Sequence, residues 1–213
     1  LEHQISYSSI KANTIFKLHK ILTAETISKN VNTVMENIEI PLIPILVKMQ
    51  AAGISLSTTY LNSMSEELNK KINAIKQVIF LTVGIEFNIG SSQQLGKILF
   101  EDLGLPHFKK NKTGYSTDAN TLEGIKQILD EAGDADTSTD DAYTVLTHVL
   151  EYRQLSKIKS TYTDALPKLV KKDTQKIHTH YNQIGTSTGR ISSISPNVQN
   201  IPTGTIIGYS VRK

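Results

Sequence analysis

Basic residues gather in one stretch of this 213-residue chain, where their charges could bind the phosphates of a nucleic acid. From Arg153 to Lys172 the sequence has six lysines or arginines and a single acid, Asp164. Arg153 and Lys157 are four residues apart, so on a helix they share one face. Clustered positive charge of this kind is the footprint of nucleic-acid binding, and its ordinary alternative is a solvated basic surface.

No pattern in the sequence predicts a metal site. The chain has no cysteine, which excludes disulfides and cysteine-ligated zinc or iron–sulfur sites. His178 and His180 would share one face of a strand, but a structural zinc site needs four ligands and no third one lies nearby in the sequence. The acidic residues between Asp130 and Asp141 lack the spacing of a calcium loop. We therefore expect neither a metal nor another cofactor in this chain.

The composition restricts the class of protein. Apolar residues make up 38% of the chain and charged residues 20%, as in globular proteins, and the formal net charge is only +3. Apolar runs such as Ile40–Met49 are far shorter than the roughly 20 residues that a membrane span needs. Leu1 is not an initiating residue and no signal peptide follows it, so we expect a cytoplasmic chain that begins inside a longer protein.

Two long helices should position the basic stretch. The first ends near Gly84 and carries a narrow apolar seam with spacings of three and four, formed by Leu61, Met64, Leu68, Ile72, Ile75 and Ile79. The second runs from about Asp140 to Leu166, where Pro167 closes it, and its apolar face comprises Val145, Val149, Tyr152, Ile158, Tyr162 and Ala165. Two seams with an insertion between them predict a long antiparallel helical hairpin with a small helical subdomain at its tip.

The insertion should hold two short helices with serine or threonine caps. We expect them from Ser91 or Ser92 to Phe100, and from Ser116 or Thr117 to Leu129. Residues 109–114 should form an exposed basic loop, and residues 133–139 should form a second loop.

The two ends of the chain have weaker patterns. One apolar stripe ends at Leu22 and a second runs from Ile27 to Ile38, which predicts two helices. Pro41 and Pro44 then mark a further helix start, and Gly53 should cap that helix at its C-terminus. Near the other end, alternation over residues 177–183 indicates a strand, whereas residues 185–202 have the composition of a loop.

One contiguous string is far more specific. Residues 183–202 read QIGTSTGRISSISPNVQNIP, which resembles the N-Q-T-x-T-x-T-G-R-L-S-S-x-x-P-N-L-Q-N-I-P segment of bacterial family A DNA polymerases. Supporting matches follow the family's order at Phe87–Ile89, Gln94–Gly96, Lys112–Thr117 and Tyr152–Tyr162. The resemblance covers about residues 36–213, and the first 35 residues look less specifically like the end of the family's exonuclease-like domain.

The resemblance implies a division into subdomains. Residues 1–38 would end the exonuclease-like domain, residues 39–172 would form the thumb with its tip at about 85–139, and residues 173–213 would begin the palm with a short β segment. The rest of the polymerase, its palm and fingers, would then be the chain's intramolecular partner. A monomer without membrane contact is expected.

The resemblance also implies a function. The parent would be a DNA-directed DNA polymerase, a nucleotidyltransferase of replication and repair that uses Mg²⁺. The family's metal-binding aspartates lie beyond the equivalent of Lys213, so this chain alone should be inactive and should grip double-stranded primer–template DNA. The residues implicated in that grip are Asn88, Ser91, Lys112, Ser116, Arg153, Lys157, Lys159, Thr161, Arg190, Asn197, Gln199 and Asn200.

Within this set Arg190 is implied to reach the minor groove at the primer end, where purine N3 and pyrimidine O2 accept hydrogen bonds in every Watson–Crick pair. Asn197, Gln199 and Asn200 are implied to lie near the template and primer strands, and turn formation is the alternative role for Asn197. For the chain as a whole, the alternative is a non-catalytic helical module that binds DNA or another protein.

Overall fold

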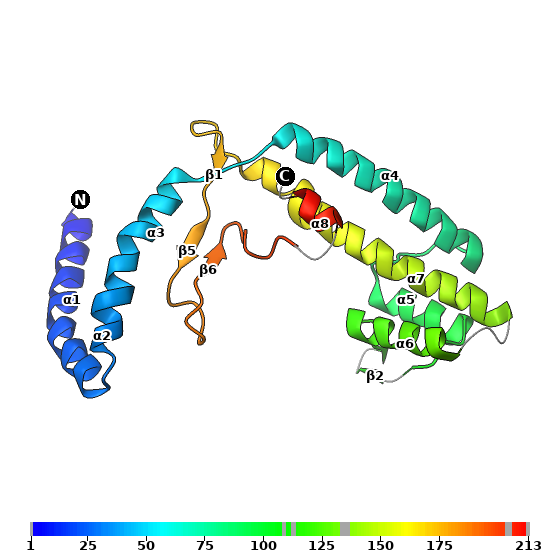
Figure 1. Cartoon of the computed structure of the whole chain (residues 1–213), viewed down its shortest axis with the longest axis horizontal. Coiled ribbons are helices and arrows are strands. Elements are labelled where there is room, and N and C mark those ends of the chain that lie inside the picture. The colour runs from blue at the N-terminus through cyan, green and yellow to red at the C-terminus, as the bar shows by residue number, and fades with distance from the viewer. Residues whose placement is uncertain (1, 108–109, 112–113, 133–136, 203–205, 212–213) are drawn as a thin grey trace. The chain divides into compact units, whose positions relative to one another are not determined.

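The computed structural model describes residues 2–107, 110–111, 114–132, 137–202 and 206–211 (Figure 1). Most of these residues are helical and the strands are two or three residues long, so the prediction of a mainly α fold is confirmed. The chain divides into two compact units. Unit 1 comprises Leu1–Ser55 with Lys176–Asn200, and unit 2 comprises Leu56–Gln175 with Ile201–Lys213.

Unit 2 is built on two long helices that pack side by side, α4 (Thr58–Val83) and α7 (Thr137–Ile158) (Figure 1). At the start of α4 the Ser57 hydroxyl accepts a hydrogen bond of 3.3 Å from the Tyr60 amide. Gly84, with a φ of 78°, ends the helix as predicted. All six predicted seam residues of α4 are buried. The helical hairpin expected from the sequence is therefore present.

The second long helix differs from its prediction at both ends. α7 begins at Thr137 rather than near Asp140, and the chain continues through a π-helical turn, η3 (Lys159–Thr163), and a 3₁₀ turn, η4 (Leu166–Leu169). Pro167 lies in the first turn of η4, where its missing N–H removes no helical hydrogen bond. The predicted face members Tyr152 and Ala165 are half-buried. The described residues of α7, η3 and η4 that are buried are Ala142, Val145, Leu146, Val149, Leu155, Ile158, Tyr162, Thr163 and Leu166.

A tip subdomain joins these helices. It consists of α5 (Ser92–Lys97), the π-helical turn η2 (Ile98–Asp102), the strands β2 (Lys110–Asn111) and β3 (Gly114–Tyr115), and α6 (Ala119–Ala132). Ser91 caps α5, as predicted. The predicted cap of α6 at Ser116 or Thr117 is wrong, because the Asp118 carboxylate accepts the hydrogen bond from the Thr121 amide, at 2.9 Å.

The two loops expected in the tip are only partly described. Within 109–114, the described residues belong to β2 and β3, which pair antiparallel with Lys110 opposite Tyr115 and Asn111 opposite Gly114. Within 133–139, residues 137–139 already belong to α7. Lys109, Lys112 and residues 133–136 lie outside the described residues.

Unit 1 begins with α1 (Glu2–Ser28), α2 (Asn32–Val34), a π-helical turn η1 (Met35–Glu39) and α3 (Ile40–Ala52). The predicted stripe from Ile27 to Ile38 is not one helix, because Asn30 has a φ of 56° and breaks the chain direction there. α3 has Pro41 in its first turn, as predicted, although the helical path already starts at Asn32. Gly53 ends α3 with a φ of 65°.

Two small antiparallel sheets complete unit 1. β1 (Ile54–Ser55) pairs with β4 (Lys176–Ile177). β5 (His180–Asn182) pairs with β6 (Ser192–Ile194), with Tyr181 opposite Ser193. The loop expected over residues 185–202 therefore contains a strand, which its serine-rich composition does not reveal. A six-residue helix, α8 (Ile206–Val211), belongs to unit 2. None of the described helices combines the length and the apolar character that crossing a membrane requires.

Candidate nucleic-acid interface

The specific string of the sequence forms the hairpin of β5 and β6 in unit 1. Arg190 is exposed near the end of the connecting segment, and its backbone carbonyl accepts a hydrogen bond of 2.7 Å from the Thr186 hydroxyl. Gly189 has a φ of 73°, a conformation that favours glycine. This local structure holds the backbone of Arg190 and leaves its guanidinium in solvent, available to a hydrogen-bond acceptor on a ligand.

The residues after β6 form a turn around one side-chain oxygen. Asn197 Oδ1 accepts hydrogen bonds from the amides of Gln199, at 3.0 Å, and Asn200, at 3.2 Å. Gln199 donates its side-chain amide to the Ile191 carbonyl at 3.0 Å. The turn role of Asn197 is therefore present. Its DNA contact stays a prediction, as do those of Gln199 and Asn200, and all three side chains belong to exposed residues.

Two buried hydroxyls, which the sequence analysis did not single out, hold this turn in place. Ser193 is fully buried; it donates to Asn197 Oδ1 at 3.3 Å and accepts from the Val198 amide at 3.2 Å. The Thr179 hydroxyl, also buried, lies 2.6 Å from the Pro196 carbonyl oxygen. The signal was the Ser-Ser pair of the string, but nothing in the sequence shows which serine faces inward.

The strand region is fixed to the C-terminal end of α3 by polar contacts within unit 1. His178 Nδ1 lies 2.8 Å from the Gln50 carbonyl oxygen, and Lys176 Nζ donates to the Ala52 carbonyl at 2.9 Å. His180 Nδ1 lies 3.1 Å from Gln50 Oε1. Basic groups are favourable at a helix C-terminus, where backbone carbonyls lack helical partners. The two histidines thus anchor a helix end.

Arg153, the first basic residue predicted on the second long helix, contacts protein atoms. Its guanidinium donates to the backbone carbonyl of Thr117 and, at 3.2 Å, to the Thr117 hydroxyl. Burial lowers the pKa of Arg153, and the nearby Asp118 carboxylate opposes that shift. The half-buried Arg153 therefore joins α7 to the tip.

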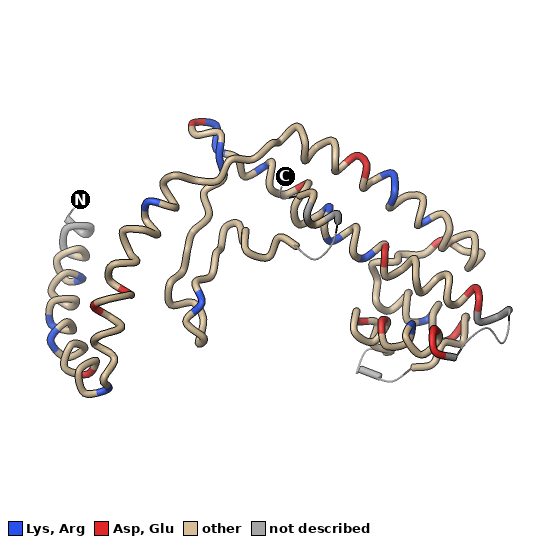
Figure 2. Tube along the Cα trace, in the orientation of Figure 1, with Lys and Arg blue, Asp and Glu red and all other residues tan. Residues whose placement is uncertain are grey.

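Lys157 and Lys159 have different surroundings. Lys157 is exposed, like Thr161 in the following turn. Lys159 forms an ion pair of 2.7 Å with Asp164, which also accepts a hydrogen bond of 2.5 Å from Ser65 on α4. Burial raises the pKa of Asp164, but the hydrogen bonds from Lys159 and Ser65 outweigh burial and leave it below its ordinary value. Figure 2 shows basic and acidic residues along both long helices.

The predicted tip residues are engaged in local structure. The Ser91 hydroxyl accepts from the Gln94 amide at 3.4 Å, and Asn88 Oδ1 accepts from the Gly90 amide at 3.0 Å. Ser116 is buried and donates to the Asp118 carboxylate. This bond, with further bonds from Thr121, lowers the pKa of Asp118 to about 2. Lys112 lies outside the described residues.

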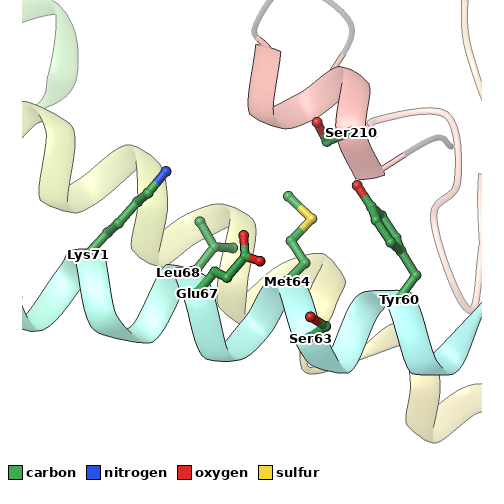
Figure 3. A pocket seen from close by; sticks show the side chains of 7 residues that line it. All are labelled: Tyr60, Ser63, Met64, Glu67, Leu68, Lys71 and Ser210. Carbon is green, nitrogen blue, oxygen red and sulfur yellow. The ribbon is translucent and has the colours of Figure 1, made fainter.

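A pocket of about 200 Å³ opens in unit 2 between α4 and α8 (Figure 3). None of the residues predicted to touch DNA lines it; its lining is Tyr60, Ser63, Met64, Glu67, Leu68, Lys71 and Ser210. Across the described ranges, no group of three or more histidine, aspartate or glutamate side chains is placed to hold a metal. The donor set here therefore does not fit the Mg²⁺ that the resemblance implies for the parent.

Comparisons with known proteins agree with the specific string. The model of the family described as DNA polymerase family A matches residues 58–213. DNA polymerase I of Bacillus caldotenax is 40% identical over 204 residues, which is 95% of this chain and 22% of that protein. DNA polymerase I of Synechocystis is 42% identical over 84% of this chain and 17% of its own length. The chain thus spans about a fifth of these relatives.

A solved structure shares the fold as well. The POL domain of Pol1 from M. smegmatis, in complex with DNA primer-template and dNTP, matches 93% of this chain and 32% of its own with a TM-score of 0.79 and 31% identity. The family model covers more than half of the chain, and the specific string lies inside the matched residues. This chain belongs to DNA polymerase family A.

Proposed function

We propose that this chain is the thumb and the start of the palm of a DNA-directed DNA polymerase, and that it grips double-stranded primer–template DNA. The observation that carries the proposal is the likeness to a polymerase domain whose solved structure contains primer-template, over 93% of this chain. The subdomain boundaries near residues 38 and 172 are part of the proposal. The antiparallel hairpin of α4 and α7, with its tip, supports the assignment of the thumb.

Two exposed basic side chains are the best candidates for direct contact. Lys157 would bind a backbone phosphate, and Arg190 would donate to minor-groove acceptors. Their exposure supports these roles, because neither side chain has to leave a buried partner first. Lys159 already pairs its charge with Asp164, so it would have to leave that carboxylate before it could bind a phosphate.

The amide residues of the turn would act beside Arg190. Asn197 uses its side-chain oxygen within the turn, so its NH₂ group is the part that would donate to DNA. Gln199 donates its NH₂ group to Ile191, which leaves its oxygen as the acceptor. In unit 2, the Thr161 hydroxyl would donate a hydrogen bond to a phosphate oxygen. Ser91, Ser116 and Asn88 would act by shaping the tip backbone.

Catalysis would reside in the remainder of the polymerase. Phosphoryl transfer of this class depends on Mg²⁺ ions held by carboxylates, which position the phosphates and neutralise their charge. The described part of this chain has no such group of ligands, so the chain by itself would bind DNA without extending it. The parent would be a nucleotidyltransferase of replication and repair.

The rest of the polymerase would be the chain's main protein partner, within a cytoplasmic monomer. The sequence of α3 is apolar on all sides, and such a helix is normally buried. Here Leu46 is buried, while Ile40, Ile43, Ile45, Val47 and Met49 are exposed. The same exposed residues favour the alternative function, a helical module that binds another protein.

Fluorescence anisotropy of a labelled primer–template duplex tests the proposal. The chain should bind, and its log affinity should fall linearly with log salt concentration, because bound phosphates release counterions. Lys157→Ala should reduce the slope by about 0.9, the value for one phosphate. Lys17→Ala, which removes an exposed charge on α1, is the matched control and should leave the slope unchanged. A duplex affinity that does not change with salt concentration would refute the proposed DNA binding and favour the protein-binding alternative. Absence of duplex binding at every salt concentration would do the same.

A further inference from the structure

Thr179 in unit 1 lies between two residues that contact the end of α3. His178 Nδ1 lies 2.8 Å from the Gln50 carbonyl oxygen, and His180 Nδ1 lies 3.1 Å from Gln50 Oε1. Burial alternates along this segment, because Ile177 and Thr179 are buried whereas the two histidines are not. The Thr179 side chain therefore faces away from the helix end, and its two anchored neighbours fix the direction in which its hydroxyl points.

The Thr179 hydroxyl contacts the start of the turn that follows β6, which we call the amide turn (residues 196–200). Its oxygen lies 2.6 Å from the Pro196 carbonyl oxygen and 3.1 Å from the Ile194 carbonyl oxygen. A hydroxyl has one proton to donate, and the shorter distance assigns it to Pro196. The Pro196 carbonyl belongs to the peptide unit that leads into Asn197, so this hydrogen bond fixes the path by which the chain enters the turn.

The amide turn is also held from inside its own hairpin. Ser193 on β6 donates to Asn197 Oδ1 and accepts from the Val198 amide, which keeps the turn folded against β6. The Thr179 hydrogen bond comes from a different segment, the one that precedes β5 and is anchored on α3. The two hydroxyls thus do different things, because Ser193 closes the turn whereas Thr179 relates its entry to the end of a helix.

We propose that Thr179 is a positioning residue for DNA binding: by holding the Pro196 carbonyl, it sets where the side chains of the amide turn meet the duplex. Groups that are already held in their bound arrangement bind more strongly than the same groups on a mobile segment, because less conformational entropy is lost on binding. Thr179 itself does not touch DNA, since its side chain is only 4% exposed. This inference rests on the proposed function, in which Asn197, Gln199 and Asn200 contact DNA.

Two substitutions separate the hydroxyl of Thr179 from the packing of its side chain. Thr179→Val keeps a β-branched side chain of similar shape and removes the donor, whereas Thr179→Ser keeps the donor and removes the methyl group. In anisotropy titrations of a labelled primer–template duplex, Thr179→Val should weaken binding by about fivefold, the equivalent of one typical hydrogen bond. Thr179→Ser should retain the affinity of the unchanged chain to within about twofold, because its hydrogen bond survives.

Amide hydrogen exchange, measured by NMR below the unfolding transition, reports whether the turn itself loosens. The amides of Gln199 and Asn200 donate to Asn197 Oδ1, so their exchange requires the turn to open. Both amides should exchange faster in Thr179→Val and at an unchanged rate in Thr179→Ser. Thr147→Val on α7 is the matched control, because the buried Thr147 hydroxyl has no hydrogen-bond partner among the described residues. That variant should change neither the exchange of these amides nor the duplex affinity.

Every other result contradicts the proposal. Unchanged exchange in Thr179→Val would refute the positioning role whatever the affinity, and faster exchange with unchanged affinity would show that DNA binding does not depend on the turn. If Thr179→Ser behaves like Thr179→Val, the methyl group and not the hydrogen bond holds the turn. Absence of duplex binding by the unchanged chain would overturn the proposed function and the consequence for DNA together, whereas the exchange rates would still show whether Thr179 holds the turn.

Discussion

Two basic side chains one turn apart on α7 show how much a residue's surroundings decide. Arg153 and Lys157 have the same charge and share a helix face in the sequence pattern, and the family resemblance implies phosphate contact for both. In the structure the Arg153 guanidinium donates hydrogen bonds to Thr117, whereas Lys157 is exposed to solvent. Helical spacing identifies residues that share a face, but it cannot show whether a loop far away in sequence occupies that face.

Gly53 is a position where a single methyl group should matter. Its φ is 65°, and a β-carbon there would lie 2.7 Å from the His178 ring. Gly53→Ala should therefore lower the free energy of unfolding by about 1–3 kcal/mol, measured by urea denaturation. Gly124→Ala is the matched control, because Gly124 lies inside α6 with an ordinary φ, and a β-carbon there would meet no atom within 4 Å. That variant should be neutral or slightly stabilising.

Asp118 should make the stability of unit 2 depend on acid pH. Its pKa is about 2 in the folded chain, against an ordinary value of 3.8. A depressed pKa contributes stability above about pH 4, and the contribution is lost as pH falls from there toward about 2. Urea unfolding between pH 5 and pH 2.5 should therefore show less pH dependence in Asp118→Asn. Equal slopes in both proteins would contradict the hydrogen bonds assigned to this carboxylate.

At the scale of elements, the long helices were predictable because each carries many turns of apolar periodicity. The six seam residues of α4 and its end at Gly84 are as the sequence indicates. Short elements depend on contacts that periodicity does not contain. β6 exists because β5 pairs with it, and the cap of α6 is Asp118 because a carboxylate there reaches the Thr121 amide.

The string predicts the turn after β6, but it does not show that the Ser193 hydroxyl holds this turn by hydrogen bonds. Ser193→Ala would remove the acceptor of the Val198 amide and one of the three hydrogen bonds that Asn197 Oδ1 accepts. We expect a loss of about 1–3 kcal/mol in unfolding free energy, measured by denaturation. Ser187→Ala, an exposed serine in the same hairpin, should change stability by less than about 0.5 kcal/mol. Similar effects of the two substitutions would contradict the role of Ser193.

At the scale of the whole molecule, the family was predictable from one string, while the division of the chain was less so. The string is specific because it combines turn residues, the buried hydroxyl of Ser193 and an exposed arginine in a fixed order, and these belong to one hairpin and turn. The two compact units depend on which distant segments pack together. Lys176–Asn200 joins Leu1–Ser55 because its strands and basic side chains bind β1 and the end of α3.

The effect of Mg²⁺ on duplex affinity is also a property of the whole molecule. The proposed binding through Lys157 and Arg190 would need no metal, and the described residues offer no cluster of metal ligands. Duplex affinity should therefore be equal in Mg²⁺ and in EDTA when ionic strength is matched, because the remaining effect of the ion is screening. Anisotropy titrations in the two buffers measure this, and primer extension with four nucleotides should give no product in either. Affinity that rises specifically with Mg²⁺ would reveal carboxylate ligands in this chain and would move part of the polymerase's metal chemistry into it.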